Sequence, residues 1–130
     1  MHTDGVSGAI AAGDFNVIRP FDNSPHSDNG LKDAYLYLGG QENRDGGYTW
    51  GQQALPAPRE RFGCSRMDNV YFCGGSLKLL SFKRLGADVE LHEQEKEQRD
   101  QLLSLGFEKP WITDHLGVKA MFNLTNGLHL

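Results

Sequence analysis

Cysteine, long apolar runs and surplus basic charge are all scarce in this chain of 130 residues. The two cysteines, Cys64 and Cys73, are too few for the disulfide framework of a small secreted domain. Their spacing would allow one bridge, but we expect two reduced thiols. No apolar run approaches the roughly 18 residues that a membrane span needs.

The first residues, "MHTDGVSGAIAAGDFN", lack the basic flank and the long apolar stretch of a signal peptide. Together with the scarcity of cysteine, this favours an intracellular protein of the cytoplasm or nucleus.

The net charge of −4 does not resemble that of a dedicated nucleic-acid binder, whose footprint is a basic stripe. Charge is nevertheless uneven, because residues 51–87 hold six bases and two acids between two acidic stretches. This local excess leaves two interpretations open. It is compatible with a phosphate-bearing ligand, and equally with a solvated face of mixed charge.

Strand-like and helix-like segments alternate along the chain and predict one domain of the α/β or α+β class. Residues 6–14 predict a strand buried on both faces, and residues 28–40 a short helix that stops at two glycines. Residues 65–73 and 76–86 predict two strands that pair with each other. Residues 52–63 are expected to be irregular, residues 93–106 to form a charged surface helix, and residues 116–124 to form a closing strand.

Asp14 and Asn16 follow the first apolar segment, in "GDFN". Their spacing places both side chains on one side of an extended chain, at the strand end where α/β sheets present ligand groups. A carboxylate there can orient or deprotonate a water, and an amide can stabilise developing negative charge. The alternative is a turn, which aspartate and asparagine favour through local hydrogen bonds.

Asp68 interrupts an otherwise apolar strand, where a carboxylate is costly unless it is paired. Its natural partner is a histidine, whose orientation a carboxylate can fix, and we choose His115. The alternative is that Asp68 faces solvent. Asp114 could contact a hard cation such as Mg²⁺, and His115 could donate to a phosphate oxygen, although a surface histidine is the usual case.

Four motifs occur in an order that resembles the C-terminal half of the endonuclease/exonuclease/phosphatase family. They are "GDFN" at 13–16, "YTW" at 48–50, "SRMDNVYF" at 65–72 and "TDH" at 113–115, followed by the closing strand. That family includes apurinic endonucleases, pancreatic deoxyribonuclease, inositol polyphosphate 5-phosphatases, neutral sphingomyelinases and phosphodiesterases that cleave 5′-phosphotyrosyl DNA. The form "YTWG" looks closest to this last, tyrosyl-DNA phosphodiesterase branch.

The resemblance implies half of a four-layered sandwich, with mixed sheets packed face to face and helices outside. It also implies a phosphodiesterase dependent on Mg²⁺ or Mn²⁺. Asp14 would activate the attacking water and Asn16 would help to position it. His115 would contact the scissile phosphate with Asp68 behind it, and Asp114 would belong to the metal shell.

Three further residues are expected near the substrate. Trp50 would flank the substrate channel, or be a buried aromatic at a strand start. Arg19 and Arg66 would contact phosphate. A phosphomonoesterase acting on inositol phosphates or a small phosphate ester is the first alternative function, and a non-catalytic binding remnant is the second.

The N-terminal half of the family domain, which supplies a glutamate to the metal site, has no counterpart in residues 1–130. The "QEN" at 41–43 follows "GDFN" instead of preceding it, so we reject it as that ligand. We therefore expect a single partial domain over 1–130 with half of a site and little catalysis by itself. A half-sandwich would also expose an apolar sheet face and self-associate through it.

Overall fold

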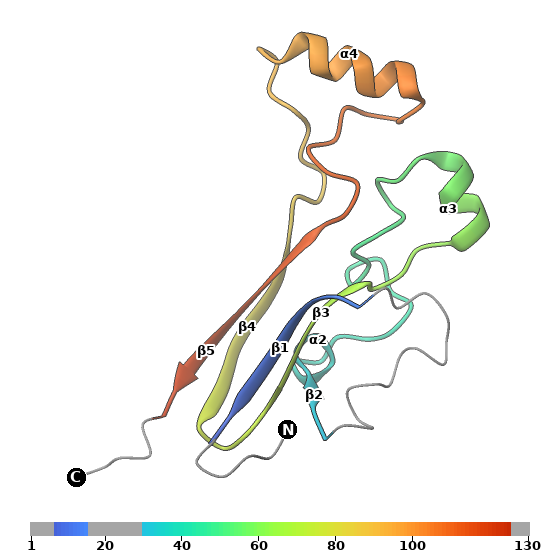
Figure 1. Cartoon of the computed structure of the whole chain (residues 1–130). Helices are drawn as coiled ribbons and strands as arrows, with labels where there is room; N and C mark the ends of the chain where they lie inside the picture. Colours follow the sequence, from blue (N-terminus) through green and yellow to red (C-terminus); the bar gives the residue numbers. More distant parts are fainter. Residues whose placement is uncertain (1–6, 16–29, 126–130) are drawn as a thin grey trace.

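The computed structural model describes residues 7–15 and 30–125, which form an α+β fold with two antiparallel sheets. The first sheet has the strand order β1-β3-β2, with β1 at Ala9–Asp14, β3 at Asp68–Cys73 and β2 at Lys32–Asp33. The second sheet pairs β4, Leu77–Leu85, with β5, Gly117–Leu124. Figure 1 shows the two sheets side by side, with helix α4 at the top of the view, beyond the ends of β4 and β5.

The core lies between the two sheets. Val70 and Phe72 point from one face of β3, and the ring of Phe72 meets that of Phe122 on β5 at 5.3 Å between centroids. Leu79 on β4 and Ala34 complete the fully buried cluster. Asp68 has the same parity as Val70 and Phe72, so it lies on this inner face at the end of the apolar row.

The three helices within residues 30–125 begin and end where the local sequence allows. In α2, Ala34–Tyr37, the Asp33 carboxylate accepts from the backbone N–H groups of Tyr35 and Leu36 at 3.0 and 3.3 Å. Helix α4, Lys96–Leu105, ends at Gly106, whose φ of 107° favours glycine. None of its residues is buried, which confirms the predicted surface helix.

The prediction of an irregular segment at residues 52–63 was wrong, because α3 spans Pro56–Phe62. Both prolines, Pro56 and Pro58, fall in the first turn, where backbone N–H groups have no partner within the helix. Proline is therefore compatible with this helix start.

The predicted pairing of residues 65–73 with 76–86 was also wrong. Both segments are strands, but β3 pairs with β1 and β2, whereas β4 pairs with β5. The residues from Asn69 to Phe72 are all buried, and such a strand needs neighbours on both edges. The Gly74-Gly75 turn therefore connects the two sheets.

Strand β1 forms where it was predicted but is not buried on both faces. Among the described residues only β3 pairs with it, and Ile10 is 47% exposed. The exposure follows from its position at the edge of the sheet.

No helix in the described part of the chain is long and apolar enough to cross a membrane.

Candidate active site

Two carboxylates face each other where the first sheet ends. Asp14 is the last residue of β1, Asp68 is the first of β3, and the antiparallel register makes them direct partners. Cross-strand partners point to the same face of a sheet, and like charges directly opposite one another are unfavourable. This pairing therefore calls for a positive or proton-donating group nearby.

The segment around Trp50 brings that group into place. Trp50 forms isolated β-bridges with Ser65 on one side and His115 on the other. The N–H of Leu116 donates to the carbonyl of Thr49 at 2.7 Å. This short segment thus joins the residues before β3 to those before β5, which are fifty positions apart, and holds His115 beside Asp68.

Gly51 permits this close crossing. Its φ of 113° lies where side chains are strained, and a Cβ there would lie 2.7 Å from Cα of Cys64. The glycine of "YTWG" therefore lets the Trp50 segment run against residues 64–65. Both Cys64 and Cys73 are free thiols, as expected.

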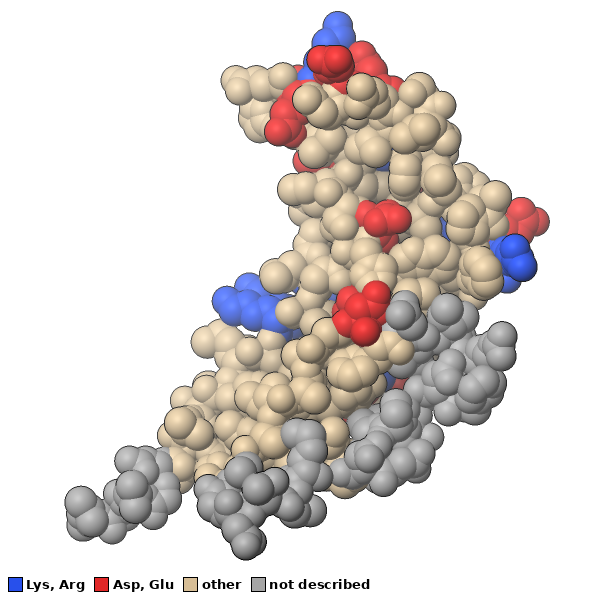
Figure 2. Space-filling view, viewed as in Figure 1, with Lys and Arg blue, Asp and Glu red and all other residues tan. Residues whose placement is uncertain are grey.

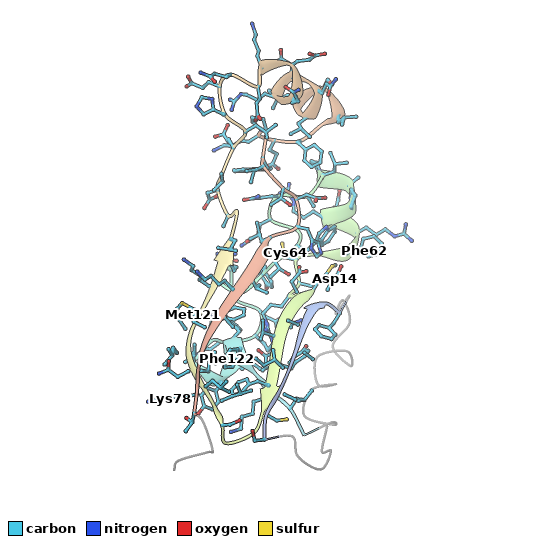
Figure 3. All side chains as sticks on the ribbon, turned by 60° about the vertical axis from the view of Figure 1, so that its left-hand side comes forward. Asp14, Phe62, Cys64, Lys78, Met121 and Phe122 are labelled. Carbon is cyan, nitrogen blue, oxygen red and sulfur yellow. The ribbon has the colours of Figure 1, made fainter. Side chains whose placement is uncertain are left out.

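His115 lies between the two carboxylates. Its Nδ1 is 2.9 Å from Oδ2 of Asp68, and its Nε2 is 3.8 Å from Oδ2 of Asp14. The side chain of Asp68 is 14% exposed, that of His115 30% and that of Asp14 45%. Asp68 therefore lies behind the imidazole and Asp14 at the surface, at the end of β1 nearer to α3 (Figure 3).

The short contact between Asp68 and His115 determines which nitrogen of the neutral imidazole carries the proton. Oδ2 of Asp68 is a buried oxygen, and it gains a hydrogen bond from His115 when Nδ1 carries a proton. Nδ1–H toward the carboxylate leaves Nε2 directed at the space beside Asp14. The carboxylate thereby fixes the tautomer and the ring orientation. The sequence-based pairing of Asp68 with His115 is seen here as a contact.

Burial raises the pKa of the Asp68 carboxyl above its ordinary value. A hydrogen bond from Thr49 and the charge of His115 lower this pKa, and the negative charge of Asp14 raises it. Burial outweighs the favourable contacts, so holding Asp68 ionised costs the fold free energy. Such a cost is typical of functional sites, though ion pairs with a structural role produce it too.

Thr49 is a positioning residue that the sequence analysis did not single out. Its hydroxyl is buried and accepts the backbone N–H groups of Met67 and Asp68, both at 3.0 Å. It thereby fixes the backbone at the start of β3. The one sequence signal for a role of Thr49 was its place in "YTW", because a threonine in a short β segment does not by itself indicate a function.

The other predicted site residues are distributed unevenly. Trp50 adjoins His115 through the β-bridge and meets the half-exposed ring of Phe62 at 6.4 Å between centroids. Asp114 is exposed and stands outside the cluster formed by the two aspartates and the histidine. Asn16 and Arg19 lie outside the described residues.

Arg66 lies in the interior, where its side chain is 8% exposed. Its Nη1 donates to Asp33 and Asn69 at 3.3 and 2.8 Å, and its Nη2 to the second Asp33 oxygen at 2.7 Å and to Glu42. Its Nε donates to the other Glu42 oxygen at 3.5 Å. All five guanidinium N–H groups are thus occupied, and the predicted phosphate contact would have to break these bonds.

The remaining basic residues of 51–87 do not converge on the site. Arg59 pairs with Glu108, the Arg61 guanidinium stacks 5.0 Å from the ring centre of Phe62, and Nη1 of Arg84 donates to Gln52 at 2.9 Å. On the face drawn in Figure 2, basic groups lie at the margins, whereas its middle carries small acidic patches. The described residues on this face therefore form no basic groove.

A divalent cation fits the chemistry of the cluster. One oxygen from each aspartate and one nitrogen of His115 lie within 4.8 Å of one another. Carboxylate oxygens suit Mg²⁺ and Mn²⁺, and Mn²⁺ also accepts imidazole. A cation would also relieve the repulsion between the facing carboxylates.

An oriented imidazole beside an exposed carboxylate, at the end of two packed sheets, is an arrangement that can perform acid–base chemistry. The family model described as "Endonuclease/Exonuclease/phosphatase family" matches residues 4–115, so the chain belongs to that family. Members of the family are hydrolases that act on phosphoester bonds. No curated protein and no solved structure matches the chain.

Proposed function

We propose that this domain hydrolyses phosphodiesters with the help of Mg²⁺ or Mn²⁺. The observation that carries the proposal is the geometry of His115, with Nδ1 against the shielded Asp68 and Nε2 toward the exposed Asp14. This arrangement presents one nitrogen and one carboxylate to the same small space.

The three side chains have distinct roles in the proposed reaction. Asp14, the most exposed, orients the attacking water and accepts its proton. In its cationic form, His115 donates the Nε2 proton in a hydrogen bond to a non-bridging phosphate oxygen as charge develops there. Asp68 holds the ring and stabilises its cationic form.

Asp14, the exposed carboxylate of the cluster, is the residue that would hold the cation, and Asp114 is proposed to join it. When bound, the cation supplies positive charge that stabilises the phosphoryl oxygens in the transition state. Asn16 is proposed to help position the water. Trp50 is proposed to flank the substrate, because it adjoins His115 and meets the half-exposed Phe62.

For the substrate we propose 5′-phosphotyrosyl DNA, on the strength of the "YTWG" segment at 48–51. This segment supports the proposed substrate because it brings His115 to Asp68 and carries Trp50.

The test measures Mg²⁺-stimulated cleavage of bis(4-nitrophenyl) phosphate and of a 5′-phosphotyrosyl oligonucleotide. Asp14→Ala and His115→Ala should each lower the metal-stimulated rate by about 10²-fold or more. His92→Ala, at an exposed histidine outside the cluster, is the matched control and should keep the native rate. A rate that is independent of divalent metal, or unchanged in His115→Ala, would refute the mechanism.

A further inference from the structure

A second feature lies next to this site: a cavity of about 370 Å³ between α4 and the chain that leads to His115. Its volume is within the range of small-molecule pockets, roughly 300–1,000 Å³. Most of its wall is apolar, and two polar residues close one side. The lining residues are Leu91, Leu102, Phe107, Trp111, Ile112, Thr113 and Asp114.

Backbone hydrogen bonds hold the walls together. The N–H of Leu91 donates to the carbonyl of Pro110 and the N–H of Ile112 to that of Val89, both at 2.8 Å. The N–H of Phe107 donates to the carbonyl of Leu102 at 3.2 Å, which ties Phe107 to the end of α4. The cavity is thus a built feature of the fold rather than a gap between loose loops.

The cavity and the candidate active site share one short segment. Thr113 and Asp114 line the cavity, and His115 is the next residue. The hydroxyl of Thr113 accepts the N–H of His115 at 3.1 Å and donates to its carbonyl at 2.8 Å. Asp114 and His115 are consecutive and their Cα atoms are about 3.8 Å apart, so the cavity begins one residue from His115.

The lining determines which group fits. The indole of Trp111 and the ring of Phe107 provide flat apolar surface, which favours a ring. The lining residues include no Lys or Arg and one carboxylate, that of Asp114, so a second phosphate is disfavoured at this place. An uncharged aromatic group meets both conditions.

We propose that this cavity binds an uncharged aromatic substituent of the phosphoester whose phosphate lies at His115. The inference rests on the proposed function, because it places the phosphate at that histidine. It makes Leu102, Phe107 and Trp111 determinants of substrate choice, from a part of the chain outside the three-residue cluster.

The experiment uses the two tryptophans of the chain as separate reporters. The protein is labelled with 5-fluorotryptophan, and its two fluorine resonances are assigned with Trp50→Phe. Trp111 then reports on the cavity and Trp50 on the active site. In the presence of Mg²⁺, the labelled protein is titrated with 1-naphthyl phosphate, inorganic phosphate and 1-naphthol.

We expect 1-naphthyl phosphate to shift both resonances with one Kd, about tenfold or more below the Kd of either inorganic phosphate or naphthol. Leu102→Gln should raise that Kd to the value for inorganic phosphate and leave the phosphate Kd unchanged. Leu103→Gln is the matched control, because Leu103 lies on the same helix, is 46% exposed and does not line the cavity.

Two further outcomes separate the inference from the function beneath it. If 1-naphthyl phosphate binds no tighter than inorganic phosphate, or leaves Trp111 unshifted, the cavity proposal is overturned while phosphate binding at His115 stands. If His115→Ala leaves every Kd unchanged, the phosphate is held elsewhere, and both the proposed function and the inference fail.

Discussion

Asp14 and Asp68 are direct cross-strand partners at the end of the β1–β3 pairing, and His115 presents one ring nitrogen to each carboxylate. Two facing carboxylates oppose folding, and the imidazole is the group in contact with both. The repulsion between the two carboxylates therefore lowers the stability of the fold, and the same arrangement brings the reactive side chains together.

Removing one of the two charges should stabilise the protein. We expect Asp14→Asn to raise the free energy of unfolding by about 0.2–1 kcal/mol without divalent cations, because the repulsion across the strands is lost. Mn²⁺ should stabilise the native chain more than this variant. Urea denaturation with and without the cation checks both, with Asp100→Asn on exposed α4 as the control. Equal stabilisation by Mn²⁺ in all three proteins would contradict a cation site at Asp14.

The raised pKa of Asp68 predicts a specific pH dependence. The folded protein binds a proton at Asp68 more tightly than the unfolded chain, whose carboxyl titrates near pH 3.9. The free energy of unfolding should therefore fall as the pH rises from about 4 through the raised pKa. Asp68→Asn should lack this fall, so its stability relative to the native protein should grow over the same interval. Parallel stability curves from pH 3 to 7 would refute the assignment.

Thr49 should matter through its hydroxyl and not through its volume. In Thr49→Val, the N–H groups of Met67 and Asp68 lose their acceptor, at a cost of about 1–3 kcal/mol for a buried unsatisfied group. The pKa of Asp68 should rise further, because the hydrogen bond that lowers it is removed. Carbon-detected NMR titration measures the pKa. Thr49→Ser keeps the hydroxyl and should retain the native pKa.

Arg66 should act as a structural anchor. Arg66→Lys leaves the Asp33, Glu42 and Asn69 partners incompletely satisfied, and breaking a buried pair costs about 3–5 kcal/mol. Urea denaturation should show this loss, whereas Arg61→Lys, beside the exposed Phe62, should be nearly neutral. In Arg66→Lys at a temperature where it is folded, the Kd for inorganic phosphate should be native. A large increase in that Kd would restore Arg66 as a phosphate contact.

The edge of the first sheet should mediate self-association. Among the described residues β1 pairs only with β3, and it carries no charge before Asp14, so none of them forms a strand along its other edge, beside the exposed Ile10. Sedimentation velocity should show association that increases with concentration and weakens in Ile10→Lys. Leu80→Lys, at an exposed residue of β4, is the control. Equal association of both variants and the native chain would exclude this edge.

Strands β1, β3, β4 and β5 and the charged helix could be predicted because their signals are local, whereas β2 lies in a segment predicted as a helix. The β-branched and aromatic residues of β3, the alternation along β4 and the charged run that ends at Gly106 define these elements within a few positions. Helix α3 was missed because prolines usually interrupt a helix. Pro56 and Pro58 are compatible with α3 because both fall in its first turn. Strand pairing was missed because nothing local distinguishes a turn between sheets from a hairpin.

For the candidate site, too, some features could be predicted from the sequence and others depended on the tertiary structure. The sequence by itself determined the family, through the order of four short motifs, and the candidate residues Asp14, Asp68 and His115. Only the tertiary structure decided that Asp14 faces Asp68 across the strands and comes close to His115. It also decided that Thr49 fixes the start of β3 and that Arg66 is already occupied. These relationships join residues up to about a hundred positions apart, so they depend on register and on the crossing at Gly51, which no local pattern encodes.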